Sequence, residues 1–265
     1  MSEDAFLALP SHRLHYRIDG DAANRALPWI LFCNSLGTDL RMWDPQAAAM
    51  AGRFRVLRYD CRGHGQSGTP PGPYSIGDLG GDALALLDAL KIERAHFCGL
   101  SIGGLTGQWL GLHAGDRLGK IVLCATAAKI GDAEGWAARI AAVKTSGLAP
   151  LVPATAERWF TPRFNAEHAA RTAGILETFT KVDPKGYNGC CAALAEADLR
   201  PEIGAICNPV LAISGDDDAV CPPSDLQDIA DHVQSGCHLS LPGRHIVNLE
   251  SARAFNEALL EFLQD

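Results

Sequence analysis

Short, continuous apolar runs recur along the chain, separated by segments whose apolar residues repeat with a helical period. A short apolar run without alternation is typical of a strand buried on both faces of a parallel sheet. Residues 5–18 alternate and predict a hairpin, whereas residues 76–90 and 250–263 predict helices. The predicted buried strands are residues 28–32, 54–59, 95–97, 120–124, 209–215 and 238–241.

This alternation of strands and helices predicts an α/β fold: a mostly parallel, eight-stranded sheet flanked by helices on both sides. The rhythm breaks after residue 130, where no strand run occurs until residue 209. We therefore expect a core formed by residues 1–130 and 206–265, with a helical cap inserted at residues 131–205. The predicted cap helices are residues 136–143, 156–160, 166–179 and 187–196.

The composition narrows the class of protein. The formal net charge of -8 disfavours nucleic acid and anionic membranes as partners, and it means that an anionic substrate needs a local cation. No apolar run approaches the length of a membrane span, and Met1-Ser2-Glu3-Asp4 lacks the basic start of a secretion signal. Nine cysteines, several of them inside strand runs, then indicate reduced thiols in a cytoplasmic protein.

One stretch carries candidate chemistry: Gly99-x-Ser101-x-Gly103 lies between the strand at 95–97 and a helical segment. This is the pattern of a nucleophile elbow, in which small residues flank a strained serine that points out of the sheet. The helix that follows offers the N–H of Ile102 to an oxyanion, and the loop after residues 28–32 offers that of Leu36. Taken alone, the pattern also fits an ordinary glycine-rich turn.

A serine nucleophile needs a base and an orienting acid, and both follow in the order Ser…Asp…His. His245, between the last strand and the last helix, is the expected base. Asp216, Asp217 and Asp218 follow the strand at 209–215, and only one of them can hold the Nδ1–H of His245. We assign His64 to loop structure, because glycines flank it in a tight turn.

The chain resembles the α/β-hydrolase fold superfamily over essentially its whole length, and it is most similar to the 3-oxoadipate enol-lactonases. Many relatives have His-Gly at the oxyanion turn, and many have threonine where this chain has Cys221. The stretches that carry the resemblance are Asn34-Ser35-Leu36-Gly37-Thr38-Asp39-Leu40-Arg41-Met42-Trp43-Asp44-Pro45-Gln46, Asp60-Cys61-Arg62-Gly63-His64-Gly65-Gln66-Ser67, Trp136-Ala137-Ala138-Arg139 and Gly243-Arg244-His245-Ile246-Val247-Asn248-Leu249-Glu250.

The resemblance implies which aspartate is the acid. In this superfamily the acid follows the strand glycine by three positions and precedes a turn that contains proline. Gly215 and Pro222 fit that pattern with Asp218 as the acid. Asp217 is the alternative.

The resemblance further implies a carboxylic ester hydrolase that opens 3-oxoadipate enol-lactone with water, in the β-ketoadipate pathway of aromatic degradation, without a metal or an organic cofactor. The substrate is a small anionic lactone, so its carboxylate needs a cation. We expect Arg139 to supply it, with Trp136 as an apolar wall and Ser35 beside the oxyanion turn. Arg139 also fits an exposed helix charge.

Other functions remain alternatives. A carboxylesterase, a C–C hydrolase of ring-cleavage products or a perhydrolase uses the same serine chemistry, whereas haloalkane dehalogenases and epoxide hydrolases have aspartate where Ser101 stands. A different class is a non-catalytic receptor for a small ligand. Self-association of the chain is left open.

Overall fold

The computed structural model describes residues 4–21, 23–24 and 26–264. The start of the chain at Met1–Glu3, which entered the cytoplasmic prediction, lies outside the described residues. The strands are β1 (Asp4–Ala8), β2 (Arg13–Asp19), β3 (Trp29–Cys33), β4 (Arg55–Tyr59), β5 (Ala95–Leu100), β6 (Leu118–Cys124), β7 (Val210–Gly215) and β8 (Gly236–Leu241).

These strands form one eight-stranded sheet in the order β1-β2-β4-β3-β5-β6-β7-β8. β2 pairs antiparallel with both β1 and β4, and every other neighbouring pair is parallel. The predicted fold class is therefore confirmed. In the parallel part, the carboxyl ends of the strands meet at one edge, and the loops that leave that edge carry the candidate chemistry.

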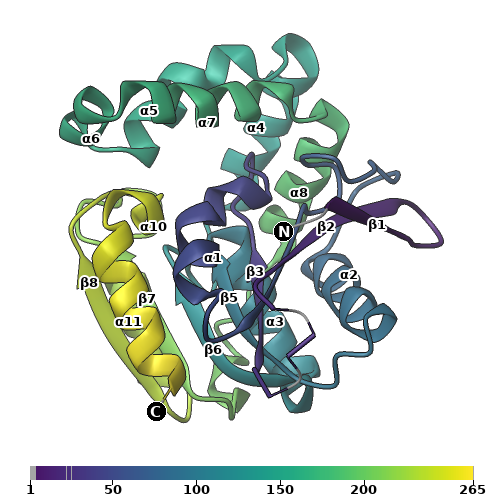
Figure 1. Ribbon diagram of the computed structural model, residues 1–265. Helices are drawn as coiled ribbons and strands as arrows, with labels where there is room; N and C mark the ends of the chain where they lie inside the picture. Colours follow the sequence, from purple (N-terminus) through teal and green to yellow (C-terminus); the bar gives the residue numbers. More distant parts are fainter. Residues whose placement is uncertain (1–3, 22, 25, 265) are drawn as a thin grey trace.

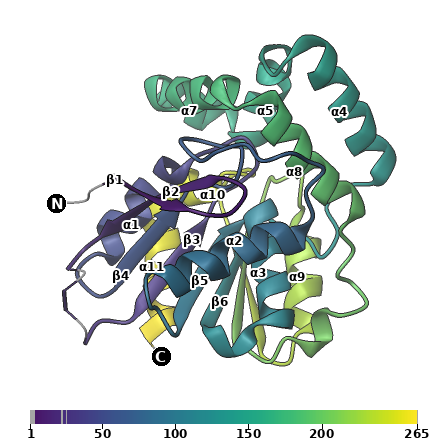
Figure 2. The same cartoon turned by 90° about the vertical axis from the view of Figure 1, so that its right-hand side faces the viewer.

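Both faces of the sheet are covered, which explains the continuous apolar runs. In β3, Ile30 and Phe32 belong to one core cluster, while Leu31 and Cys33 belong to the other. Helices α1 (Asp44–Met50) and α11 (Ala252–Gln264) lie on the first face. The other face carries α2 (Ile76–Ala89), α3 (Ile102–His113) and α9 (Pro223–His232), seen from the front in Figure 2.

Between β6 and β7 the chain leaves the sheet and forms helices above the carboxyl ends of the parallel strands (Figure 1). Aromatic side chains join these helices: the rings of Trp159 and Phe179 lie 5.6 Å apart, and those of Phe179 and Tyr187 lie 5.8 Å apart. The helices are α4 (Ala133–Ser146), α5 (Val152–Trp159), α6 (Pro162–Glu167), α7 (Ala169–Lys181) and α8 (Pro184–Glu196).

Three local features differ from the sequence expectations. α1 was not expected, and the single helix expected at 166–179 is divided at His168 into α6 and α7. The helix expected at 250–263 is also divided, into α10 (Val247–Glu250) and α11, with Ser251 between them. Nowhere in the described ranges is a helix both long and apolar enough to cross a membrane.

Candidate active site

Ser101 lies at the turn between β5 and α3 in a conformation that side chains rarely adopt, with φ 59° and ψ -118°. A Cβ on Gly99 would lie 2.2 Å from the carbonyl oxygen of Gly103, and a Cβ on Gly103 would lie 2.4 Å from the last carbonyl of β3. Both positions therefore require glycine. The turn is held by the Ser101 N–H, which donates to the Cys124 carbonyl at 2.9 Å, and by the Thr126 hydroxyl, which donates to the Ser101 carbonyl at 2.7 Å.

His245 follows β8 and meets Asp218, which follows β7. The His245 Nδ1 lies 2.9 Å from Asp218 Oδ2, and the two side chains are 3% and 0% exposed. Asp218 Oδ1 accepts hydrogen bonds from the backbone N–H groups of Val220 at 2.7 Å and Cys221 at 3.2 Å. A carboxylate with both oxygens engaged keeps the proton of His245 on Nδ1, so Nε2 is free to accept a proton.

The three consecutive aspartates have three different partners. Asp217 is 61% exposed and pairs with Arg244 Nε at 2.7 Å, while Asp216 accepts from the backbone N–H of Gly243 at 2.9 Å. Among the three, Asp218 is the carboxylate that reaches the ring of His245.

The turn after β3 holds a backbone donor that has no acceptor among the described residues. Within the described residues, Leu36 N–H has no hydrogen-bond acceptor, whereas the donors on either side of it are engaged. Ile102 opens α3, so its N–H has no acceptor inside the helix. These are the two donors expected for an oxyanion. The engaged donors are Ser35 N–H to Met42 Sδ (3.4 Å), Gly37 N–H to His64 Nε2 (3.0 Å) and Thr38 N–H to the Ser35 carbonyl (3.2 Å).

His64 stabilises this turn through hydrogen bonds of its imidazole ring. Its Nδ1–H donates to the Arg62 carbonyl at 3.1 Å, which leaves Nε2 to accept the N–H of Gly37. Burial lowers the pKa of His64, so the ring stays neutral and keeps that acceptor. Its contacts are those of a residue that shapes a loop.

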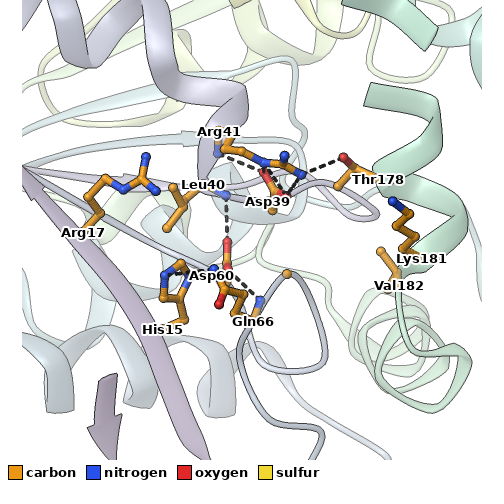
Figure 3. Close-up of a pocket in the computed structure, with 11 residues that line it drawn as sticks. His15, Arg17, Asp39, Leu40, Arg41, Asp60, Gln66, Thr178, Lys181 and Val182 are labelled. Carbon is orange, nitrogen blue, oxygen red and sulfur yellow. Dashed lines mark hydrogen bonds and ion pairs between the residues drawn. The ribbon is translucent and has the colours of Figure 1, made fainter. Parts of the chain in front are cut away.

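A buried carboxylate joins the same turn to the rest of the sheet. Asp60 accepts the N–H of Leu40 on one oxygen at 2.8 Å, and on the other it accepts the N–H of Gln66 at 2.8 Å and meets His15 Nδ1 at 2.6 Å (Figure 3). The cavity drawn there measures about 400 Å³, but ion pairs neutralise its charges. Those pairs are Arg17 with Asp4, Arg41 with Asp39 and Lys181 with Glu177.

A second, smaller cavity of about 70 Å³ lies above the serine. Most of the side chains predicted for the site line it: Ser35, Leu36, Ser101, Trp136, Arg139 and His245. Asp218 lies behind His245, and Ile102 contributes its backbone. The helices above the sheet complete the wall with Thr155, Arg158, Trp159, Phe179, Tyr187 and Leu194.

Arg139 on α4 faces this cavity and is half-buried. Its Nη1 donates to the Tyr187 hydroxyl at 3.2 Å, and the guanidinium lies 5.9 Å from the ring centre of Trp136. Burial raises the pKa of Tyr187 to about 12, so this partner is an uncharged phenol. No carboxylate pairs with Arg139 in the part of the chain that is described.

Sequence reasoning missed Arg158 and the aromatic wall. Arg158 lies in the segment predicted as a helix at 156–160, but an arginine on an amphipathic helix is ordinarily solvated, and nothing along the sequence set it apart. Trp159 and Phe179 lie in the segments predicted as helices at 156–160 and 166–179, and no role was assigned to either. Only the packing of the helices over the serine reveals that these side chains face the site.

The arrangement suits acyl transfer: a strained serine, an imidazole oriented by a carboxylate, and two backbone donors at one strand edge. The cation beside them suits a substrate with a carboxylate. Across the described ranges, no three His, Cys, Asp or Glu side chains come together as a metal site.

Comparisons with known proteins agree with this geometry. A family model described as alpha/beta hydrolase fold matches residues 28–252. The chain is 44% identical to 3-oxoadipate enol-lactonase 2 of Acinetobacter baylyi, over 93% of this chain and 91% of that protein. It is 40% identical to 3-oxoadipate enol-lactonase 1 of the same organism, over 89% of each. The crystal structure of the enol-lactonase from Burkholderia xenovorans LB400 superposes with a TM-score of 0.96 at 44% identity, covering 98% of this chain and 100% of that chain.

Proposed function

The chain belongs to the α/β-hydrolase fold family, and from that premise we propose that it is a serine hydrolase that opens 3-oxoadipate enol-lactone with water to give 3-oxoadipate. The observation that carries the proposal is the likeness to enol-lactonases over nearly the whole chain. The contact between His245 and Asp218 beside Ser101 supports it. The small cavity also suits a compact ring better than a long acyl chain.

The first step forms an acyl-enzyme. His245 Nε2 takes the proton of the Ser101 hydroxyl while Oγ attacks the lactone carbonyl. The backbone N–H groups of Leu36 and Ile102 bind the oxyanion that develops. Asp218, which engages Nδ1, stabilises the imidazolium that forms.

The ring then opens and the acyl-enzyme is hydrolysed. The bond between the carbonyl carbon and the ring oxygen breaks, and His245 returns the proton to the enol oxygen that leaves. The enol tautomerises to the ketone, which draws the reaction forward. His245 next takes a proton from water, the hydroxide adds to the ester of Ser101, and the collapse of the second tetrahedral intermediate returns the serine and releases a carboxylate.

The helices above the site recognise the rest of the substrate. We propose that residues 131–205 act as a cap, in which Arg139 binds the carboxylate of the substrate and Trp136 packs against its ring. Ser35 lines the side of the cavity next to the oxyanion turn. Nine free cysteines, most of them buried, suit a reducing compartment, and we place the enzyme in the cytoplasm.

The decisive test follows the ultraviolet absorbance of the enol-lactone with purified protein and with Ser101→Ala. We expect rapid loss of absorbance with the wild type and none above background with the variant. A fluorophosphonate probe should label the wild type and not the variant.

Two other outcomes would count against the proposal. A wild-type protein that reacts with the probe but leaves the lactone intact would keep the serine chemistry and reject this substrate. A protein that neither labels nor hydrolyses would reject serine catalysis and favour a small-ligand receptor.

A further inference from the structure

Two arginines from different helices face the cavity above Ser101. Arg139 comes from α4 and Arg158 from α5, and both line the wall together with Ser101 and His245. Elsewhere, most buried or half-buried arginines, such as Arg58, pair with aspartates, whereas Arg55 donates to the Leu27 carbonyl and stacks on Trp29. Within the described residues, neither Arg139 nor Arg158 pairs with a carboxylate.

The guanidinium of Arg158 has hydrogen-bond donors that are available to a ligand. Its Nε donates to the carbonyl of Ala154, one turn earlier on the same helix, at 3.1 Å. Among the described residues, its two terminal nitrogens have no hydrogen-bond acceptor. The contact with Ala154 orients the side chain and leaves the two terminal nitrogens free to bind a ligand.

The helix that carries Arg158 is fixed to the loop of the base. The N–H of Ile246, directly after His245, donates to the carbonyl of Trp159 at 3.2 Å. Arg244, directly before His245, donates from Nη1 to the carbonyl of Glu157. Arg158 is therefore held at a set position relative to His245.

The two cations also act on each other. Burial lowers the pKa of Arg158, and the charge of Arg139 lowers it further. An arginine nevertheless stays protonated at neutral pH, so two like charges meet across one small cavity. The chain has a formal net charge of -8, and yet these two arginines have no carboxylate partner among the described residues. Their position beside the nucleophile favours the binding of an anion there.

We propose that Arg158 is a specificity-determining residue that forms, with Arg139, a two-guanidinium clamp for the carboxylate of a small acyl substrate. The inference rests on the proposed function, because it assumes that Ser101 attacks a carbonyl held in this cavity. Arginine suits the role because its planar fork matches a carboxylate with two parallel hydrogen bonds. A bound carboxylate would also neutralise the repulsion between the two guanidinium groups.

The clamp favours a substrate with a carboxylate a few bonds from the reactive carbonyl over a neutral substrate of the same size. Two chromogenic esters test this selectivity without the lactone: the monoanion p-nitrophenyl succinate and the neutral p-nitrophenyl butyrate. Their acyl chains have the same length and differ at the far end.

We expect Arg158→Met to lower kcat/KM for the succinate ester about 10- to 100-fold, the range of a lost charge-assisted hydrogen bond to a carboxylate. Most of the loss should lie in KM, because a remote carboxylate is bound equally in the ground state and the transition state. The butyrate ester should change less than threefold. Arg158→Lys should recover part of the loss.

Arg163→Met is the matched control, because Arg163 lies on the adjacent α6, is 85% exposed and, among the described residues, pairs with Glu167 alone. It should leave both esters unchanged. A second readout is thermal: adipate should raise the Tm of the wild type and not that of Arg158→Met. Without ligand, Arg158→Met should melt at the wild-type temperature or above it, because it removes a like-charge repulsion.

Three results would overturn the inference. One is an unchanged ratio of succinate to butyrate activity in Arg158→Met. Another is an equal loss on both esters with a lower Tm, which is the signature of a purely structural residue. The third is an unchanged response of the variant's Tm to adipate.

The proposed function can fail independently. If the wild type leaves the enol-lactone intact but Arg158→Met abolishes the preference for the succinate ester, the clamp stands and the lactone is the wrong substrate. If the lactone is hydrolysed equally well by Arg158→Met, the proposed function stands and the clamp is wrong.

Discussion

Replacing Asp218 by asparagine tests the assignment of the acid most sharply, because two of the neighbouring contacts dictate how the new amide must lie. The N–H groups of Val220 and Cys221 both donate to Oδ1. The amide oxygen of Asn must take that position, so its NH₂ group faces His245. An NH₂ group cannot accept the Nδ1–H, and the imidazole must then carry its proton on Nε2.

A His245 protonated on Nε2 cannot take the proton of Ser101. Loss of the working tautomer in a Ser-His-Asp triad lowers kcat by about 10⁴-fold, and we expect Asp218→Asn to lose about that much. Asp217→Asn provides the matched control one residue away. It removes an ion pair of a 61% exposed carboxylate with Arg244, and exposed pairs contribute about 0–1 kcal/mol to stability.

The assay is the loss of lactone absorbance at saturating substrate, with circular dichroism and Tm to show that both variants fold. We expect Asp217→Asn to keep kcat within about twofold, since its contact lies outside the site. The reasoning is refuted if Asp218→Asn keeps more than a tenth of the wild-type kcat. It is equally refuted if Asp217→Asn loses activity while Asp218→Asn does not.

Three further changes probe the support of the site. His64→Ala removes the acceptor for the N–H of Gly37, and we expect kcat to fall about tenfold in the absorbance assay, less than for the loss of an oxyanion donor itself. Gly103→Ala brings a Cβ within 2.4 Å of a backbone carbonyl and should lower the free energy of unfolding by about 2–4 kcal/mol in urea titrations, whereas Gly81→Ala, which meets nothing within 4 Å in α2, should raise it by about 0.5–1 kcal/mol. Burial lowers the pKa of His96 to about 4, so the unfolded chain binds the extra proton first; Tm should fall as the pH drops from about 6.5 to 4, and less steeply in His96→Gln.

The sheet could be predicted because its central parallel strands are buried on both faces and consist mostly of apolar side chains. α1 could not, because its seven residues are too few to show a helical period, and its stability comes from distant partners. Gln46 on this helix donates to the carbonyl of Asn248 at 2.9 Å, and the preceding Trp43 packs its ring 6.3 Å from that of Phe255. Contacts over two hundred positions apart leave no periodic trace in a local window.

The candidate site divides in the same way. Ser101, His245 and three candidate aspartates could be predicted from their order along the chain and from their positions at the ends of strands. Catalysis by a serine hydrolase requires a nucleophile, an acid and a base, and few residue types can serve in those roles. Among the three aspartates, the resemblance favours Asp218 with Asp217 as the alternative, and the three-dimensional contacts show that Asp218 is the one that reaches His245. The catalytic roles of these residues remain predictions that the experiments above test, and the boundaries of the cap also remain a prediction.

The inserted helices contact the core next to the base. In our proposal the cap therefore helps to align the substrate with His245, in addition to covering the site. The end of α5 receives hydrogen bonds from Arg244 and Ile246, the two neighbours of His245. The loop that positions His245 therefore also holds the helix that carries Arg158. When Arg158 binds the carboxylate of a substrate, it also fixes the distance between the reacting carbonyl and His245. This contact holds the substrate in the ground state as well as in the transition state, so its loss should appear mainly in KM. A hydrolase with this core and a different cap would keep the nucleophile and the base, but it would lose the coupling between recognition of a distant charge and placement of the carbonyl.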